Sequence, residues 1–322
     1  MIDIIAERSP FGGLERWLTD PAVDEVIVNG GGQVWVERCG TLQRVATMSS
    51  AAVTGAIEHI LRPIGRRLDR SNPTVDARLP DGSRVCAVLE PIAVDGACLT
   101  IRRFALRSLP LSAFANEKVA QLLHSVVASR CNVLVSGATS SGKTTLLNTL
   151  AGLVPATERI ITLEDIAELR LDHLHVVRLE ARPANAEGSG EVTLAQLLRT
   201  ALRMRPDRLV IGEIRGAEAV QLVQAMNTGH DGSMATVHAN SALDAVARLC
   251  SLVLQEVPGW PLDAIHDQVR RSIDVVVHVG RGADNQRRVI EVRECDVVSG
   301  GVNLRRLADR SDVLAPLRRQ RS

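Results

Sequence analysis

Short apolar runs separated by turn-forming residues fill the first hundred positions of the chain. Glu25–Asn29 and Gln33–Arg38 each read as a strand, and the glycines between them predict a hairpin. A second hairpin is expected where Pro80-Asp81-Gly82 separates Val75–Leu79 from Arg84–Leu89, because these three residues favour a tight turn. This part of the chain is therefore predicted to form paired short strands.

One helix and one further strand complete the first half. Ala51–Leu61 carries apolar residues at helical spacing and stops before Pro63, and Cys98–Phe104 has the pattern of a strand. We therefore expect a small α+β domain over residues 1–105. A linker is expected over residues 106–116, in which Ser112 would cap the helix that follows.

From about residue 130 the pattern changes to apolar strands that alternate with helices. Thr193 and Ser241 are followed three residues later by Gln196 and Asp244, a spacing typical of helix starts. This alternation predicts an α/β fold for residues 117–322, with a mostly parallel sheet covered by helices. The expected strands are Asn132–Ser136, Ile160–Glu164, Leu209–Glu213, Met234–His238 and Asp274–Val279, with a β-ribbon of Val289–Val292 and Asp296–Val298 after them.

The composition is that of a folded chain with two domains. It has 322 residues, of which 45% are hydrophobic and 23% charged, enough apolar material for sizeable cores. A net charge of +1 supplies no broad positive field, and three Phe, three Trp and no Tyr leave few faces for base stacking. We therefore expect no nucleic-acid partner.

Cysteine spacing and hydropathy limit the metal content and the location. The six cysteines form no C-x-x-C pair, so they are interpreted as small buried hydrophobes in a reducing compartment rather than as zinc ligands. No run of 18 apolar residues is present, and the first residues lack a signal-peptide pattern. These features predict a cytoplasmic protein.

A glycine-rich loop carries the strongest chemical signal. Residues 137–144 match G-x-x-x-x-G-K-[ST] between an apolar strand and a helix, so backbone N–H groups and the helix N-terminus can hold phosphates. Lys143, one of only two lysines, is expected to reach the β- and γ-phosphates of ATP, and Thr144 to place its hydroxyl on Mg²⁺. The predicted nucleotide contacts are Gly137, Ala138, Thr139, Ser140, Ser141, Gly142, Lys143, Thr144 and Thr145.

Acidic residues stand at the ends of two of the predicted strands. Parallel strands end at one edge of a sheet, where ligands of open α/β sheets bind. We expect Glu213 to orient and activate the attacking water, and Glu164 or Asp165 to hold Mg²⁺ directly or through water. Glu168 competes for the same roles, and each acid could instead be a solvated charge at a strand end.

Two histidines flank the predicted strand Met234–His238. His230 precedes it and His238 ends it, and we expect both to face the crevice beside the glycine-rich loop. An imidazole there could donate to a phosphate oxygen or position a carboxylate. Taken singly, each is more simply explained as a structural histidine, as are the six others. Zinc binding is not expected, because no third ligand has a suitable spacing.

The motifs together resemble those of the secretion-superfamily ATPases, which power type II and type IV secretion and type IV pili. Beyond the glycine-rich loop, the similarity rests on ITLED at 161–165, LRMRPDR at 202–208, GEIRG at 212–216 and TGHDGS at 228–233. AMNTGH at 225–230 and HAN at 238–240 look like the tight-adherence (Flp) pilus branch, as do EVIVNG at 25–30 and RLPDGSRV at 78–85. The resemblance covers roughly residues 12 to 280.

The resemblance implies roles for individual residues. The family's acidic box falls on Glu164, Asp165 and Glu168, its Walker B glutamate on Glu213, and its histidine box on His230 and His238. It also implies a RecA-like P-loop domain behind a smaller, PAS-like α+β domain. The tetracysteine zinc insertion of the type II branch is missing, so no metal beyond Mg²⁺ is assigned.

Family members are hexamers in which arginines of the N-terminal domain or of a neighbouring subunit reach the phosphates. Arg102 and Arg103 fit the first source, and Arg203 and Arg215 the second, although each could simply form a surface ion pair. The implied function is a hexameric ATPase motor that drives pilus assembly or protein secretion through an integral platform protein of the inner membrane. The alternatives are a RecA-like nucleic-acid translocase and a slow nucleotide switch.

Overall fold

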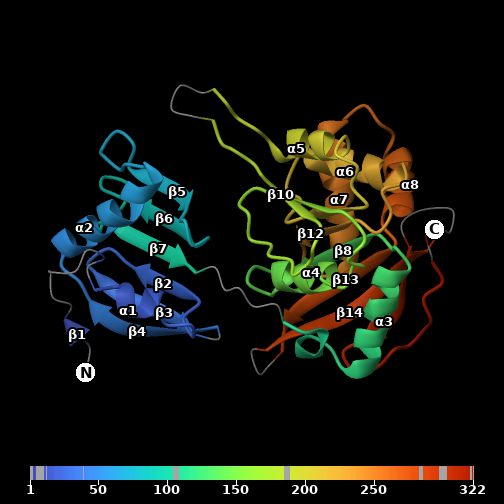
Figure 1. Ribbon diagram of the computed structural model, residues 1–322, viewed down its shortest axis with the longest axis horizontal. Helices are drawn as coiled ribbons and strands as arrows, with labels where there is room; N and C mark the ends of the chain where they lie inside the picture. Colours follow the sequence, from blue (N-terminus) through green and yellow to red (C-terminus); the bar gives the residue numbers. More distant parts are fainter. Residues whose placement is uncertain are drawn as a thin grey trace. The chain divides into compact units, whose positions relative to one another are not determined.

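The chain folds into two compact units, Met1–Leu106 and Arg107–Ser322 (Figure 1). The computed structural model describes residues 3–4, 11, 13–38, 40–103, 109–184, 189–282, 286–296, 303–319 and 321. Much of the linker expected at 106–116 lies within the second unit, where Leu111–Ala113 forms a short 3-10 helix.

The first unit is a seven-stranded sheet with two helices. Its strand order is β1-β4-β3-β2-β7-β6-β5, antiparallel throughout except for the β1–β4 pair. Val26 and Val34 are buried between half-buried neighbours and pack with Ile57 in one core. The elements are β1 (Asp3–Ile4), α1 (Glu15–Leu18), β2 (Glu25–Val28), β3 (Gln33–Arg38), β4 (Thr41–Thr47), α2 (Ser50–Leu61), β5 (Thr74–Arg78), β6 (Arg84–Val88) and β7 (Cys98–Arg102).

The second unit is an eight-stranded, mostly parallel sheet in the order β10-β9-β11-β12-β8-β13-β14-β15. The strands from β10 to β13 are parallel, and β14 and β15 extend the sheet as an antiparallel ribbon. The strands are β8 (Val133–Gly137), β9 (Ile160–Glu164), β10 (Val176–Glu180), β11 (Arg208–Ile211), β12 (Met234–His238), β13 (Val275–Arg281), β14 (Arg287–Asp296) and β15 (Asn303–Asp309).

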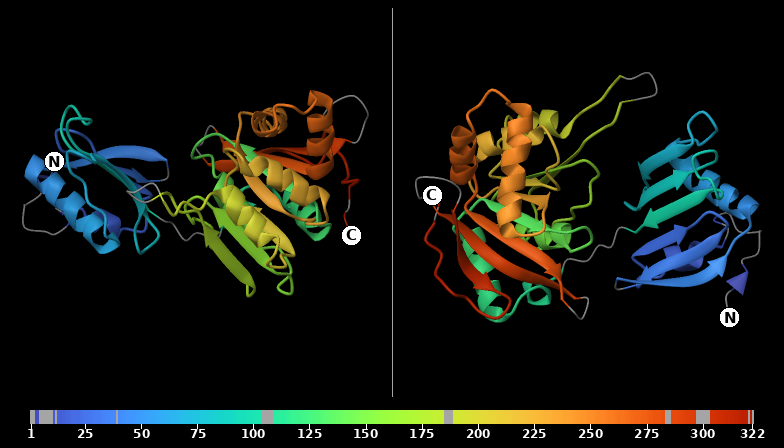
Figure 2. Two further views of the ribbon diagram at one scale, coloured as in Figure 1. Left: turned by 90° about the horizontal axis from the view of Figure 1, so that it is seen from above. Right: turned by 180° about the vertical axis from the view of Figure 1, so that it is seen from behind.

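Helices cover both faces of this sheet, as Figures 1 and 2 allow the reader to follow. Leu134, Ile161 and Ile211 face a core shared with α5 to α8, whereas Val133, Val135 and their alternating neighbours face α3 and α4. Because helices cover both faces, these strands are buried along almost their whole length. The helices are α3 (Glu117–Ala128), α4 (Lys143–Ala151), α5 (Leu194–Ala201), α6 (Glu218–Asn227), α7 (Ala242–Glu256) and α8 (Leu262–Ser272).

The predicted fold class is confirmed, with two local corrections. The ribbon strand expected at Asp296–Val298 is wrong: β14 continues to Asp296 and its partner is β15, while 297 and 298 lie outside the described residues. Ser112 does not cap a helix, because Asn116 accepts the cap bond from the backbone N–H of Val119 at 3.0 Å. Thr193 does form the expected capping box with Gln196.

A buried ion pair fixes the amino-terminal edge of the second sheet. Arg208 is 1% exposed, and its Nε lies 2.6 Å from Glu158 Oε2. A Cβ on Gly232 would stand 1.8 Å from Arg208 Nη1, so only glycine leaves room for this guanidinium. Gly232 also has φ +78, a conformation that side chains rarely adopt.

The carboxy-terminal segment crosses the same edge and neutralises a second buried charge. Asp274 is fully buried, and its Oδ1 lies 2.5 Å from Arg319 Nε while its Oδ2 lies 2.6 Å from Arg321 Nε. Arg321 also reaches Asp231 Oδ1 at 2.6 Å. Burial raises the pKa of Asp274 even against these arginines, because desolvation penalises the charged carboxylate.

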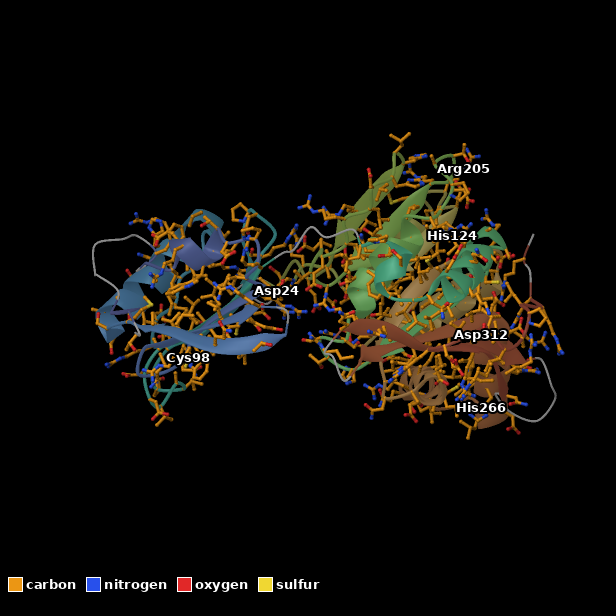
Figure 3. All side chains as sticks on the ribbon, turned by 90° about the horizontal axis from the view of Figure 1, so that it is seen from below. Asp24, Cys98, His124, Arg205, His266 and Asp312 are labelled. Carbon is orange, nitrogen blue, oxygen red and sulfur yellow. The ribbon has the colours of Figure 1, made fainter. Side chains whose placement is uncertain are left out.

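The remaining cysteines and lysine have ordinary structural positions. Cys131, Cys250 and Cys295 are buried as expected, and burial raises their pKa values to between about 11 and about 12, but Cys86 is exposed, which corrects that expectation. Lys118 pairs at 3.0 Å on the surface with Asp312, which Figure 3 labels. Cys39 lies outside the described residues. No helix in the described ranges is long and apolar enough to cross a membrane.

Candidate nucleotide-binding site

The glycine-rich loop connects the end of β8 with the first turn of α4, as the motif requires. Gly137 ends the strand, and a Cβ there would lie 2.3 Å from the backbone oxygen of Val279 and 2.4 Å from Ser141 Oγ. Ser140 has φ +58 and Gly142 φ +98, so the loop turns through left-handed conformations just before the helix. Successive left-handed and right-handed residues turn backbone N–H groups toward one concavity, which suits an anion.

Two polar side chains of the loop are placed for a ligand. Lys143 Nζ donates to the backbone oxygen of Ala138 at 2.9 Å, so the ammonium group lies folded over the loop. Ser141 is 3% exposed, and its Oγ has no hydrogen-bond partner among the described residues. Thr144 and Thr145 in the first turn of α4 are half-buried. The predicted phosphate contacts therefore form one continuous loop.

Glu164 is a buried carboxyl at the end of β9. It is 2% exposed, and its Oε1 accepts hydrogen bonds from the backbone N–H groups of Glu168 and Leu169 at 2.8 and 2.9 Å. Its Oε2 is buried without a partner in the described part of the chain. Burial is the main reason that the pKa of Glu164 rises to about 7, although the two N–H groups and Arg178 oppose it.

Glu213 lies just after β11, the strand next to β9, and hydrogen bonds to the backbone of its two neighbours in sequence hold it on both sides. Thr236 Oγ1 donates to the oxygen of Gly212 at 2.6 Å, and the N–H of Ile214 donates to the oxygen of Thr236 at 2.8 Å. A Cβ on Gly212 would stand 2.9 Å from Glu164 Cγ, so the two acidic positions are adjacent. Asp165 follows Glu164 but is exposed.

The two histidines lie at opposite ends of β12. His238 ends the strand and pairs in register with Gly137, which places it beside the glycine-rich loop. His230 precedes the strand, where its N–H donates to the oxygen of Ala225. Five residues of strand, about 16 Å, lie between the two ends. The expectation that both histidines face one crevice is therefore wrong for His230, because the parallel register sends the ends of β12 to opposite edges.

Arg203 lies at the same amino-terminal edge of the sheet as His230, far from the glycine-rich loop of its own chain. It follows α5 and precedes β11, in the segment where Figure 3 labels Arg205. Its side chain is exposed and makes no hydrogen bond or ion pair within the described residues. Arg215 instead lies at the edge of the sheet that carries the glycine-rich loop, where its Nε donates to Glu213 Oε2 at 2.7 Å. The two arginines grouped by sequence thus have different surroundings.

The arginines expected from the first unit also differ from each other. Arg103 Nη1 donates to the backbone oxygens of Asp20 and Val23, the latter at 3.0 Å, which ties down the loop before β2. This is a structural role within its own unit, and the phosphate contact expected of Arg103 stays a prediction. Arg102, at the end of β7, is exposed.

Sequence reasoning missed three side chains around the loop. Glu218 is 7% exposed, and its Oε1 accepts from the backbone N–H groups of Arg215 and Gly216 at 2.5 and 2.9 Å, which fixes the turn after Glu213. Arg281 and Arg287, on β13 and β14, lie against the loop. Glu218, three residues after Arg215, could have been predicted as an acid at a helix start. Nothing in the sequence links Arg281 and Arg287 to a loop about 140 residues earlier.

This combination of fold and loop defines the protein as a RecA-like P-loop ATPase. Two acids and a histidine stand at the carboxyl edge of the sheet beside a phosphate-binding loop. The comparisons with known proteins agree. The family described as "Type II/IV secretion system protein" matches residues 7–306, and the chain belongs to this family.

Individual relatives are similar over most of their length. A protein of Mycobacterium tuberculosis named for conjugal transfer is 40% identical over 299 residues, covering 89% of this chain and 84% of the relative. The type IV secretion system protein PtlH of Bordetella pertussis is 35% identical over 316 residues, covering 87% and 92%. The structure of the ATPase DotB of Legionella pneumophila is similar in fold, with a TM-score of 0.63 at 19% identity, covering 92% of this chain and 85% of DotB.

Proposed function

We propose that this ATPase is a hexameric motor of a tight-adherence-type pilus or a type IV secretion machine. It would act at the cytoplasmic face of the inner membrane through an integral platform protein. The observation that carries the proposal is the edge at which the P-loop, Glu164 and Glu213 converge. Family membership and relatives named for type IV secretion and conjugal transfer support the choice of machine.

Binding of ATP would use groups that the loop already presents. Lys143 Nζ would exchange the oxygen of Ala138 for phosphate oxygens, and Ser141 Oγ would gain the partner that its burial requires. The residues fit a magnesium ion bound with ATP, because Thr144 offers a hydroxyl and Glu164 keeps one buried oxygen without a partner. The ion would neutralise charge on the β- and γ-phosphate oxygens.

Hydrolysis would be assisted by the two acids. Water attacks the γ-phosphorus, the bond to the β–γ bridging oxygen breaks, and the water's proton passes to a carboxylate. Glu213 is proposed as that carboxylate, because hydrogen bonds between Thr236 and the backbone of Gly212 and Ile214 hold it in place from both sides. Arg215, paired with Glu213 Oε2, would hold this carboxylate oriented until water binds.

A neighbouring subunit would complete the site. Arg203 and His230 lie at the amino-terminal edge of the sheet, so they can reach phosphates only in another subunit. Arginines supplied in trans stabilise the charge that spreads over the transferred phosphoryl group. This division of the site between subunits favours a closed ring over a monomer.

The proposal is tested by two variants of the purified full-length chain. Lys143→Ala should abolish ATP hydrolysis and weaken ATP binding, because the phosphates lose their ammonium partner. Glu213→Gln should retain ATP binding but hydrolyse at least about 10²-fold more slowly, because an amide cannot accept the proton. Both should keep the circular dichroism spectrum of the parent. Near-normal turnover of Lys143→Ala would refute the P-loop site, and loss of binding by Glu213→Gln would make Glu213 a metal ligand instead.

A further inference from the structure

The β13–β14 hairpin passes directly beside the P-loop of its own chain. β13 pairs in parallel with β8 from Val275 to His278 and then continues for three residues past that pairing. The oxygen of Val279 fills the space that a Cβ on Gly137 would occupy. Arg281, which ends β13, is the register partner of Arg287, which begins β14. The hairpin therefore brings two arginines to the level of the loop.

Both arginines contact the loop from the same side. Arg281 Nε donates to the backbone oxygen of Ser140 at 3.2 Å, which anchors the residue with φ +58. The stem of Arg287 lies over Gly142: a Cβ built there would stand 2.7 Å from Cδ, 3.3 Å from Cγ and 3.5 Å from Cβ of Arg287. Because Nε is one bond beyond Cδ, the guanidinium of Arg287 begins within reach of the loop residue that precedes α4.

We propose that Arg287 binds the α- and β-phosphates of the nucleotide held by the P-loop of the same chain. This inference rests on the proposed nucleotide site. The N–H groups around Gly142 are those that cradle the α- and β-phosphates in a P-loop, and the stem of Arg287 covers that residue. A guanidinium forms paired, charge-assisted bonds with phosphate oxygens, which the single ammonium of Lys143 cannot duplicate.

The assignment separates Arg287 from the arginines proposed to act in trans. Its partner phosphates are present in ADP as well as in ATP, so its contribution belongs to binding in both nucleotide states. An arginine that stabilises the transferred γ-phosphoryl group would instead favour ATP and the transition state. Arg287 thus needs no neighbouring subunit, and its effect should be the same at protein concentrations above and below ring assembly.

The test uses Arg287→Gln, which keeps the methylene packing over Gly142 and removes the charge. The dissociation constants of ADP and ATP, measured by calorimetry on the full-length chain, should both rise about tenfold to a hundredfold. The salt dependence of ADP binding should also become shallower. Arg288→Ala is the matched control: it removes the next arginine of β14, which is exposed and points to the other face of the strand.

Three results would overturn the inference. These are ADP binding within twofold of the parent, an equal loss in Arg288→Ala, and a loss confined to ATP. Lys143→Ala measured in parallel separates the two levels of the proposal. If Lys143→Ala still binds ADP normally, the nucleotide site itself is wrong; if it loses ADP while Arg287→Gln does not, only the role of Arg287 is wrong. The thermal unfolding of Arg287→Gln without nucleotide controls for a folding defect.

Discussion

Glu164 and Glu213 end neighbouring strands but have different surroundings. Glu164 is 2% exposed and satisfies only one of its oxygens, whereas Glu213 is paired with Arg215 and open to solvent on one side. Burial therefore raises the pKa of Glu164 to about 7, because desolvation penalises the charged carboxylate, whereas Glu213 forms an ion pair with Arg215 at the surface.

The raised pKa of Glu164 makes stability depend on pH. Folding raises this pKa from 4.5 to about 7, so between these values the folded chain binds a proton that the unfolded chain lacks. The free energy of unfolding should therefore fall as pH rises through this window, relative to Glu164→Gln, and the difference should level off above about pH 8. Urea unfolding of both chains from pH 5 to pH 8, without nucleotide, measures it.

The comparison with Glu164→Gln cancels the other titrating groups. Asp274 also has a raised pKa, but it is present in both chains. Parallel pH profiles for the two chains would show that Glu164 titrates as an exposed carboxyl does, and would contradict the environment described for it.

Prediction from sequence at the residue scale has the most information where a site is local in the chain. The P-loop is one contiguous run, so its conformational needs are written in neighbouring glycines and one lysine. The contacts of Arg287 and Asp274 were not predicted because their partners lie far away in the sequence. With 36 arginines in the chain, the sequence does not indicate which partner each one has. His230 was misplaced because the parallel register of β12 with β8 puts the two ends of β12 at opposite edges of the sheet.

Elements were predicted well where periodicity was strong. The buried parallel strands and the capped helix α5 are dictated by apolar runs and a capping box. β4 was missed because its first four residues, Thr41 to Arg44, are exposed and show no alternation. The ribbon partner was placed too early because β14 continues for ten residues, and only pairing with β15 fixes where it ends.

The carboxy-terminal segment should contribute strongly to the stability of the second unit. Removing both guanidinium groups with Arg319→Ala and Arg321→Ala would leave Asp274 buried as an uncompensated charge. The free energy of unfolding should fall by about 3–5 kcal/mol, as measured by urea denaturation. Adding Asp274→Asn should recover part of the loss, because an amide carries no charge to solvate.

Arg318→Ala provides the matched control for this segment. Its side chain is exposed and makes no hydrogen bond or ion pair within the described part of the chain, while its backbone N–H donates to Glu294 Oε1 at 2.8 Å. Its effect should stay within about 0.5 kcal/mol, as for other surface substitutions. A comparable loss in Arg318→Ala, or no loss in the double variant, would show that Asp274 does not depend on these arginines.

At the scale of the whole molecule, the split site predicts complementation between subunits. Arg203→Ala and Lys143→Ala chains should each be inactive alone. Mixed rings should regain activity, because some interfaces then join an intact P-loop to an intact arginine of the neighbour. The measurement is an ATPase titration of one variant into the other, with light scattering to verify mixed rings and a dependence on protein concentration.

Arg215 serves as the contrast in this experiment. It already contacts Glu213 of its own chain, so Arg215→Ala should be rescued less than Arg203→Ala. Mixed rings without any return of activity for Arg203→Ala, at any ratio, would exclude the trans role and leave Arg203 as a surface arginine.

The opposite ends of β12 give each subunit a polarity. One edge of the sheet offers a phosphate-binding loop, and the other offers Arg203 and His230, so the proposed action in trans would require head-to-tail contact between copies rather than a self-complementary one. In an open row of n such subunits only n − 1 junctions exist, and the terminal P-loop has no neighbour to supply an arginine. Under the proposed division of the site, closing the row would supply that last P-loop with an arginine, so ring closure itself would activate the final catalytic unit.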